Sequence, residues 1–321
     1  MVSQVLGKRL LQFLLVFFGI TLITFAILHL SPKNPAELWL IGPGGQAGMV
    51  SEEALAAQEK AMGLDQPFLV QYGRWLFGAI QGDLGLSFQS KEPVSALLLR
   101  HMGPTLWMTG CAFLGTLLLA VPLGMLCAVR PGGVMDRLLQ GLGFFAISLP
   151  SFVVALFLLW LVCMKLRLLP VIASGSWQGL LLPTLVLIFQ SALKLIRQVK
   201  AIVRTQLQSP YVEGARMRGV PEKTILFSHV LKNSAPAICT CLSFYLGAFL
   251  SGSAVIENVF TIQGLGTLGV SAIAQMDYDL IQGFVLWCAM IFFLLNALVD
   301  CLALCIDPRL RQGVGKGGTW E

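Results

Sequence analysis

Six long apolar stretches limit what this chain can fold into more than any other feature of its sequence. Each is close to the roughly 20 apolar residues that a helix needs to cross a bilayer. They cover residues 10–30, 105–129, 138–164, 180–199, 235–256 and 281–305. Strand-length alternation of apolar and polar residues, typical of membrane β-barrels, is absent. The sequence therefore predicts an all-α integral membrane protein with six transmembrane helices.

The composition supports this prediction. Apolar residues make up 56% of the 321 residues and charged residues only 12%, against about 25% charged in an average soluble chain. Too few polar residues are left over for a separate catalytic domain. The first stretch is longer than a signal-peptide core, and the sequence around His29–Lys33 has no small-x-small cleavage site. We therefore expect this stretch to be retained as a span.

The basic residues are distributed unevenly between the segments that separate the spans. With six spans and the N-terminus inside, the inner segments carry 15 of the 22 basic residues and a net charge of +9, and the outer segments carry −3. Such a bias orients membrane proteins with the positive side in the cytoplasm. It predicts that both termini are cytoplasmic, and it explains the net charge of +6 without nucleic-acid binding.

This orientation gives the expected organisation of the chain. In order, we expect a cytosolic N-terminus, a first transmembrane helix, an extracytoplasmic region, a five-helix core with a cytosolic loop at 203–234, and a cytosolic tail; their bounds are 1–9, 10–30, 31–104, 105–308 and 309–321. In the extracytoplasmic region, Ser51 as N-cap and Gly63 as a stop predict a short helix.

Two of the expected spans contain a residue that is unusual in a transmembrane helix. Pro150 removes a helical hydrogen bond and predicts a kink in the third span. This kink could line a translocation path or serve packing alone. Asp300 is the only acid well within an apolar stretch, where a hydrogen bond near the inner face and a proton relay are both plausible.

The cytosolic loop at 203–234 carries two helix starts. Ser209-Pro210 provides an N-cap followed by proline at the first helical position, with Glu213 near the positive end of the helix dipole. Gly219 ends this helix, and Pro221-Glu222 starts a second that we expect to run to about Lys232. Two short helices set at an angle predict a compact docking surface for a cytosolic partner rather than a solvated loop.

Enzymatic sites are not apparent in the sequence. The tail around Lys316 only superficially resembles a Walker A loop, because leucine and glycine occupy its defining positions at 310 and 317. His29 and His101 fall at the outer ends of the first two spans, where contacts with water are commoner than metal ligation. We predict no catalytic residue, no metal site and no cofactor.

The cytosolic loop at 203–234 resembles the corresponding loop of a known family. Glu213-Gly214-Ala215, with Gly219 following, is similar to the EAA loop of binding-protein-dependent ABC importer permeases. His229, Leu231, Lys232 and Asn233 resemble the ending of that loop in the peptide/nickel subfamily. Further motifs resemble the B-type permease of that subfamily; they include Gly63–Pro67, Gly82–Ser87, Glu257–Phe260, Gly264–Gly266, Asn296–Asp300 and Asp307–Arg309.

The resemblance implies a type I ABC importer permease fold in a bacterial inner membrane. It implies a heterodimer with a second homologous permease, two cytosolic ATP-binding subunits and an extracytoplasmic binding protein. Glu213, Gly214, Ala215, Gly219, His229 and Asn233 would form the coupling loop to the ATPase. The subfamily handles dipeptides, oligopeptides, nickel and metal chelates, so the substrate stays open.

The alternative is a secondary transporter or channel that works alone. Such a protein would need intramembrane ionisable residues or broken helices arranged in an inverted repeat. Neither pattern is visible in this sequence. Co-purification with an ATPase pair would separate the importer from the stand-alone transporter.

Overall fold

The structure is a computed structural model that describes residues 2–31, 33–42, 50–170 and 177–306. It divides into two compact units. The first unit comprises residues 104–262 and the stretch from 292 onward, and the second comprises residues 2–103 and 263–291. Within the described ranges all regular structure is helical, apart from an isolated bridge between Leu86 and Pro93. The all-α prediction is therefore confirmed.

The second unit is built from the N-terminal helices and from one helix late in the chain. Its helices are α1 (Val2–His29), α2 (Pro35–Ile41), α3 (Glu52–Met62), α4 (Phe68–Ile80) and α12 (Leu265–Gln275). It also includes the beginnings of α5 (Val94–Val129) and α13 (Tyr278–Ile306). Aromatic contacts join α1 to α4, because Phe25 packs edge-on against both Phe68 and Tyr72.

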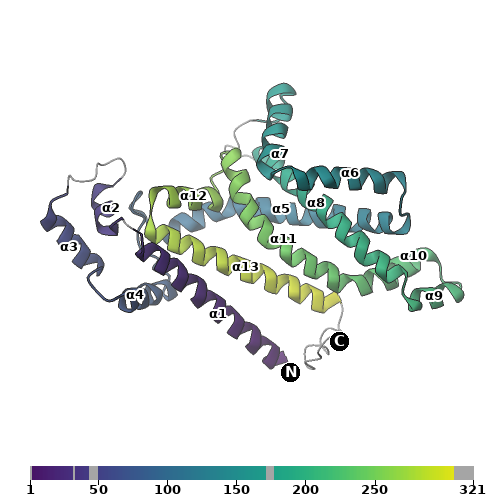
Figure 1. The fold of residues 1–321 in the computed structure, drawn as a ribbon, viewed down its shortest axis with the longest axis horizontal. Coiled ribbons are helices and arrows are strands. Elements are labelled where there is room, and N and C mark those ends of the chain that lie inside the picture. Colours follow the sequence, from purple (N-terminus) through teal and green to yellow (C-terminus); the bar gives the residue numbers. More distant parts are fainter. Residues whose placement is uncertain (1, 32, 43–49, 171–176, 307–321) are drawn as a thin grey trace. The chain divides into compact units, whose positions relative to one another are not determined.

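The first unit contains the remaining helices and most of the apolar core. They are α6 (Val134–Ser148), α7 (Ser151–Leu158), η1 (Leu159–Lys165), α8 (Trp177–Leu207), α9 (Pro210–Met217), α10 (Glu222–Thr224), η2 (Ile225–Val230) and α11 (Leu231–Val259). In this unit α8 lies beside both α6 and α11 (Figure 1). Leu195 and Val199 of α8 and Phe249 of α11 are buried in its core.

Within the described part of the chain, four helices are long and apolar enough to cross a membrane. They are the helical segments 94–129, 178–207, 222–259 and 278–299, and the bent pair of α6 and residues 151–165 would make a fifth span. In α1 the side chains are described from Leu14 onward, and Leu14–His29 is a shorter apolar helix. The structure thus supports a multi-span protein, and the number six stays a prediction.

The third span differs from the expected kinked helix. Residues 138–164 are divided into α6 and a second helical segment, which are bent by 107° where they meet. Leu149 is extended, with φ −101° and ψ 128°, and Pro150 precedes the first residue of α7. A residue before proline is pushed out of the helical region by the proline ring. The helix therefore stops and restarts here, whereas the sequence predicts a kink within one helix.

The second short helix of the cytosolic loop is also different from the expectation. It does not end near Lys232, because α10, η2 and α11 follow one another without a break from Glu222 to Val259. The middle segment, η2, is a π-helix, in which the hydrogen bonds skip one residue more than in an α-helix. The start at Pro221 is confirmed, and the loop therefore contains one separate short helix, α9.

The predicted start and end of the short helix α3 in the second unit are confirmed. The Ser51 side chain accepts a hydrogen bond from the Ala54 amide at 3.3 Å at the start of α3. Gly63 ends α3 in the left-handed conformation, with φ +70°. Glycine adopts this conformation at little cost because it has no Cβ atom. Short-range sequence signals therefore suffice to define this helix.

Candidate coupling site

The helix α9 begins as the sequence indicates but without the expected side-chain cap. Ser209 is extended and Pro210 occupies the first turn. The Ser209 hydroxyl instead donates to the Thr205 carbonyl at 3.3 Å. Proline suits the first helical position because its missing N–H would have no helical partner there. Backbone conformation, rather than a capping hydrogen bond, therefore sets the start of α9.

One face of α9 is buried in the first unit. Val212 and Ala215 have almost no exposed surface and belong to the same core cluster as Ile225 of η2. The sequence motif assigns Ala215 to the coupling loop. The structure places its methyl group inside, so Ala215 positions α9 by packing and does not present a side chain to solvent.

The opposite face of the loop is exposed and partly apolar. Glu213 lies on this face, and a Cβ atom added to Gly214 would contact nothing within 4 Å. Met217 is 81% exposed and Phe227 is 60% exposed. These side chains leave apolar surface of the loop available for contact with another protein.

The turn after α9 depends on Gly219. Its φ is +75°, and an added Cβ atom would meet open space. The Gly219 amide donates to the Arg216 carbonyl at 2.9 Å, and the Val220 amide donates to the Ala215 carbonyl at 3.2 Å. A side chain at 219 would therefore be strained by the backbone and would project outward from the loop.

An ion pair closes this turn. The Arg216 guanidinium donates to the Glu222 carboxylate at 2.6 Å from Nε and at 3.4 Å from Nη2. The hydrogen bond to Glu222 raises the pKa of Arg216 above its usual value. Both side chains are largely exposed, and exposed pairs stabilise proteins by about 0–1 kcal/mol. The pair therefore contributes little beyond holding α9 against α10.

The other two predicted loop residues lie farther along the chain. His229 is in η2 and Asn233 is in the first turn of α11, and both are exposed. Val230, between them, is fully buried. All six predicted loop residues thus belong to the first unit. Of these six, only Ala215 is buried. Pro150, the predicted kink residue, is exposed at the bend between α6 and α7.

Buried carboxyl groups with hydrogen-bond partners are absent from the predictions made on sequence. In the first unit Glu257 of α11 is fully buried and accepts a hydrogen bond from the Thr105 hydroxyl at 2.7 Å. Asp300 is therefore not the only acid within a long apolar helix. The sequence does carry a signal for Glu257, since Phe249, Ser253 and Glu257 recur every four residues and form one buried stripe.

Another buried carboxyl group lies in the second unit. Asp277 accepts from the Ser87 hydroxyl at 2.6 Å and from the Phe88 amide at 3.0 Å. Nearby, the Lys91 ammonium donates to the Trp39 carbonyl at 2.9 Å. Burial lowers the pKa of Lys91, and the charge of Asp277 opposes that shift. These contacts join the loop after α4 to the start of α13.

The two outer histidines have separate partners in the second unit. His29 packs edge-on against the Phe68 ring, and a ring nitrogen of His101 hydrogen-bonds the Leu97 carbonyl at 2.8 Å. No cluster of three or more potential metal ligands occurs among the described residues. The Asp300 side chain and residues 307–321, including Lys316, lie outside the described part of the chain.

The helical spans and the α9 loop define the class of protein, a multi-pass membrane permease with the type I ABC importer fold. The chain belongs to the family described as "Binding-protein-dependent transport system inner membrane component", which it matches over residues 120–312. Residues 1–109 match the N-terminal family "Binding-prot-dependent transport system membrane comp, N-term". The resemblance visible in the sequence is therefore confirmed.

Curated relatives cover nearly the whole chain. The glutathione transport system permease protein GsiC of Shigella flexneri serotype 5b (strain 8401) is 33% identical over 304 residues, which is 95% of this chain and 97% of the relative. The nickel import system permease protein NikB of Staphylococcus aureus (strain bovine RF122 / ET3-1) is 34% identical over 307 residues, which is 96% of this chain and 92% of the relative.

Solved structures share the fold. Two crystal forms of the MetNI methionine ABC transporter in inward-facing conformations match with TM-scores of 0.54 and 0.52, at 19% and 18% sequence identity. They cover 66% and 67% of this chain and nearly all of the matched chains. At this level of identity the likeness shows the fold alone.

Family membership defines the role of the chain within a larger machine. It is an inner-membrane permease subunit of an ABC importer, and it works with ATP-binding subunits and a binding protein. ATP is hydrolysed in the separate subunits, so the permease itself is not catalytic. The expected function and the non-enzymatic assignment are confirmed.

Proposed function

We propose that this chain forms the translocation path together with a second homologous permease, above two cytosolic ATP-binding subunits. In this arrangement residues 31–104 face the binding protein and both termini are cytoplasmic. The support is the charge bias of +9 inside against −3 outside. The substrate class is that of the peptide/nickel subfamily, namely a dipeptide or oligopeptide, nickel or a metal chelate. The GsiC and NikB relatives lie within this range.

The single observation that carries the coupling role is the geometry of the α9 loop. Its inner face is fixed by the buried Val212 and Ala215, while Glu213 and Met217 are exposed. A segment that is rigidly packed on one side can transmit a movement applied to the other. We therefore assign residues 203–234 as the segment that an ATPase subunit moves when ATP binds. Glu213 can face a basic group of that subunit.

The experiment is substitution at Gly219. Gly219→Asp adds a charged side chain to the exposed turn. It also forces a residue other than glycine into the left-handed backbone conformation, at a cost of roughly 1–2 kcal/mol. We expect it to abolish uptake and to reduce recovery of the ATPase subunits, while the permease remains in the membrane. Glu213→Ala should weaken uptake less. The measurements are a pull-down and ATP hydrolysis by the reconstituted complex with its loaded binding protein.

A matched pair separates docking from backbone strain. Gly219→Ala and Gly132→Ala both introduce a Cβ atom at a positive φ, +75° and +77°, with open space around it. Only position 219 lies in the proposed docking surface, so only Gly219→Ala should impair recovery of the ATPase. Normal assembly and uptake in Gly219→Asp would show that this loop is not the coupling element.

A further inference from the structure

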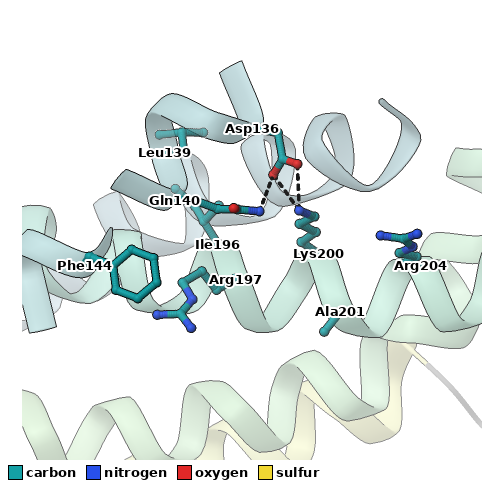
Figure 2. A pocket seen from close by; sticks show the side chains of 9 residues that line it. All are labelled: Asp136, Leu139, Gln140, Phe144, Ile196, Arg197, Lys200, Ala201 and Arg204. Atoms are coloured by element: carbon teal, nitrogen blue, oxygen red, sulfur yellow. Dashed lines mark hydrogen bonds and ion pairs between the residues drawn. The ribbon is translucent and has the colours of Figure 1, made fainter. Parts of the chain in front are cut away.

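A basic cavity lies between α6 and α8 in the first unit (Figure 2). Its volume is about 400 Å³. The cavity is lined by three basic residues, one acid and five other side chains: Arg197, Lys200, Arg204, Asp136, Leu139, Gln140, Phe144, Ile196 and Ala201. Its lining carries a net charge of +2. Of the lining residues, only Arg204 lies within the segment 203–234 that is assigned to coupling.

The acid in the cavity is fully engaged. Asp136, 3% exposed, accepts from the Lys200 ammonium at 2.6 and 2.8 Å, from the Gly132 amide at 2.8 Å and from the Gln140 amide at 3.3 Å. Lys200 and Asp136 therefore neutralise each other. The net positive charge comes from Arg197 and Arg204.

The two arginines supply the positive charge of the cavity that has no acidic partner. Both are exposed on α8, seven residues apart, so they lie on the same side of the helix about 10 Å from each other along its axis. Lys200 and Ala201 lie between them, and Arg197 is turned toward Phe144 (Figure 2). The Arg197 guanidinium lies 5.4 Å from the centre of the Phe144 ring, which restricts its position. Neither arginine has a carboxylate partner within the described residues.

The surroundings of the cavity indicate what kind of anion fits. On the side of α6 that faces the cavity, the apolar side chains of Phe144 and, one turn farther along, Ile147 are more than half exposed. A soluble anion needs no such surface, whereas the acyl chains of a lipid do. In the proposed topology the start of α6 and the end of α8 lie at the cytoplasmic face, where the anionic lipids of the inner leaflet attract basic residues.

We propose that this cavity binds the headgroup of an anionic phospholipid from the cytoplasmic leaflet. Arg197 and Arg204 donate charge-assisted hydrogen bonds to the phosphodiester oxygens, as arginine commonly does with phosphate. The acyl chains lie against the exposed apolar side chains of α6. The proposal rests on the topology given under the proposed function, and it concerns a lipid that stays bound at the protein rather than a transported substrate.

The test is native mass spectrometry of the full chain, extracted with any co-purifying subunits from nanodiscs of phosphatidylglycerol and phosphatidylcholine. The wild type should retain phosphatidylglycerol in preference to phosphatidylcholine. Arg197→Gln/Arg204→Gln should reduce the retained phosphatidylglycerol at least about tenfold, the equivalent of one charge-assisted hydrogen bond. Arg130→Gln/Arg137→Gln removes the same charge from exposed inner positions outside the cavity. This control should retain the lipid.

Two further measurements distinguish a bound lipid from free phosphate and separate this proposal from the coupling role. Millimolar inorganic phosphate should not displace the lipid; displacement would show a free-phosphate site and overturn the proposal. Equal lipid retention in the cavity variant and the wild type, or equal loss in the control variant, would also overturn it. A cavity variant that keeps its lipid but loses its subunits would show that a protein partner occupies the cavity. Since lipid retention needs no ATP hydrolysis, a failed coupling test leaves this measurement intact.

Discussion

Carboxyl groups in the helical core illustrate how single residues are stabilised without access to water. Glu257 is fully buried, and the Thr105 hydroxyl donates to it at 2.7 Å. Leaving a buried polar group without a donor costs about 1–3 kcal/mol, and more for a charged one. This hydrogen bond therefore contributes to the relative placement of α5 and α11 in the first unit.

The first prediction concerns this hydrogen bond. Thr105→Val keeps the shape of the side chain but removes the donor, and it should lower the free energy of unfolding by about 1–3 kcal/mol. Thr105→Ser keeps the hydroxyl and should stay closer to the wild type. Thermal unfolding of the purified chain in detergent measures both. Equal unfolding temperatures for the valine and serine variants would show that the hydroxyl is not needed.

The second prediction concerns two glycines in the second unit. Gly82 and Gly85 both have left-handed backbones, with φ of +86° and +83°. A Cβ atom at Gly82 would meet open space, whereas one at Gly85 would lie 2.5 Å from an Asp279 carboxylate oxygen. Asp279 would then have to move and would lose its hydrogen bond with the Leu86 backbone.

Gly82→Ala should therefore destabilise the chain by roughly 1–2 kcal/mol, the strain of the backbone alone. Gly85→Ala should exceed that loss by about 1 kcal/mol, the value of a typical hydrogen bond. Chemical or thermal unfolding of the full chain compares the two variants. If Gly82→Ala were the more harmful of the two, the close approach of Asp279 would not matter.

At the scale of elements, α9 is held mainly by apolar packing. Its ion pair, Arg216 with Glu222, is exposed on both sides, so it contributes at most about 1 kcal/mol. Its buried residues, Val212 and Ala215, join the core cluster of the first unit. The orientation of the helix, and with it the exposed face proposed to contact the ATPase, therefore depends on a small residue at 215.

The third prediction tests this dependence. Ala215→Leu inserts a larger side chain into a packed site and should destabilise the chain by about 1–3 kcal/mol. It should also reduce recovery of the ATPase subunits, because α9 must shift to accommodate leucine. Gly141→Ala on α6, outside the loop, is the control, since its Cβ atom would contact nothing. It should leave stability equal or slightly higher and assembly intact, as a pull-down and a melting curve would show.

At the scale of the whole molecule, the orientation in the membrane follows from charge. The excess of basic residues in alternate segments predicts that residues 31–104 are extracytoplasmic and that the loop at 203–234 is cytosolic. Both the coupling role and the lipid site depend on this orientation. It is a property of the whole chain, because each segment is oriented by the spans on either side of it.

The fourth prediction tests the orientation directly. In a cysteine-free background, a single cysteine at Ser90 should react with an impermeant maleimide added to intact cells, and one at Ser228 should react only after permeabilisation. Both side chains are exposed in the structure, so neither is shielded by the chain itself. Labelling in the reverse pattern would invert the topology and remove the basis of both proposals.

The sequence by itself determined the features that depend on nearby residues. The apolar stretches marked the long helices, Ser51 and Gly63 bounded α3, and Gly219 marked the turn after α9. The motif around Glu213, together with the further motifs along the chain, indicates the family. Helix propensity, capping and backbone conformation act over a few residues, so they can be read without knowing the fold.

Only the tertiary structure decided which side chains meet across long separations. Ala215 is buried, Glu257 hydrogen-bonds Thr105, which is 152 residues away in the sequence, and Lys200 pairs with Asp136, which is 64 residues away. The size of the bend at Pro150 also came from the structure, because proline stops a helix but does not set the direction of the next one. Such contacts depend on how whole helices pack against one another, and packing involves every residue of both faces at once.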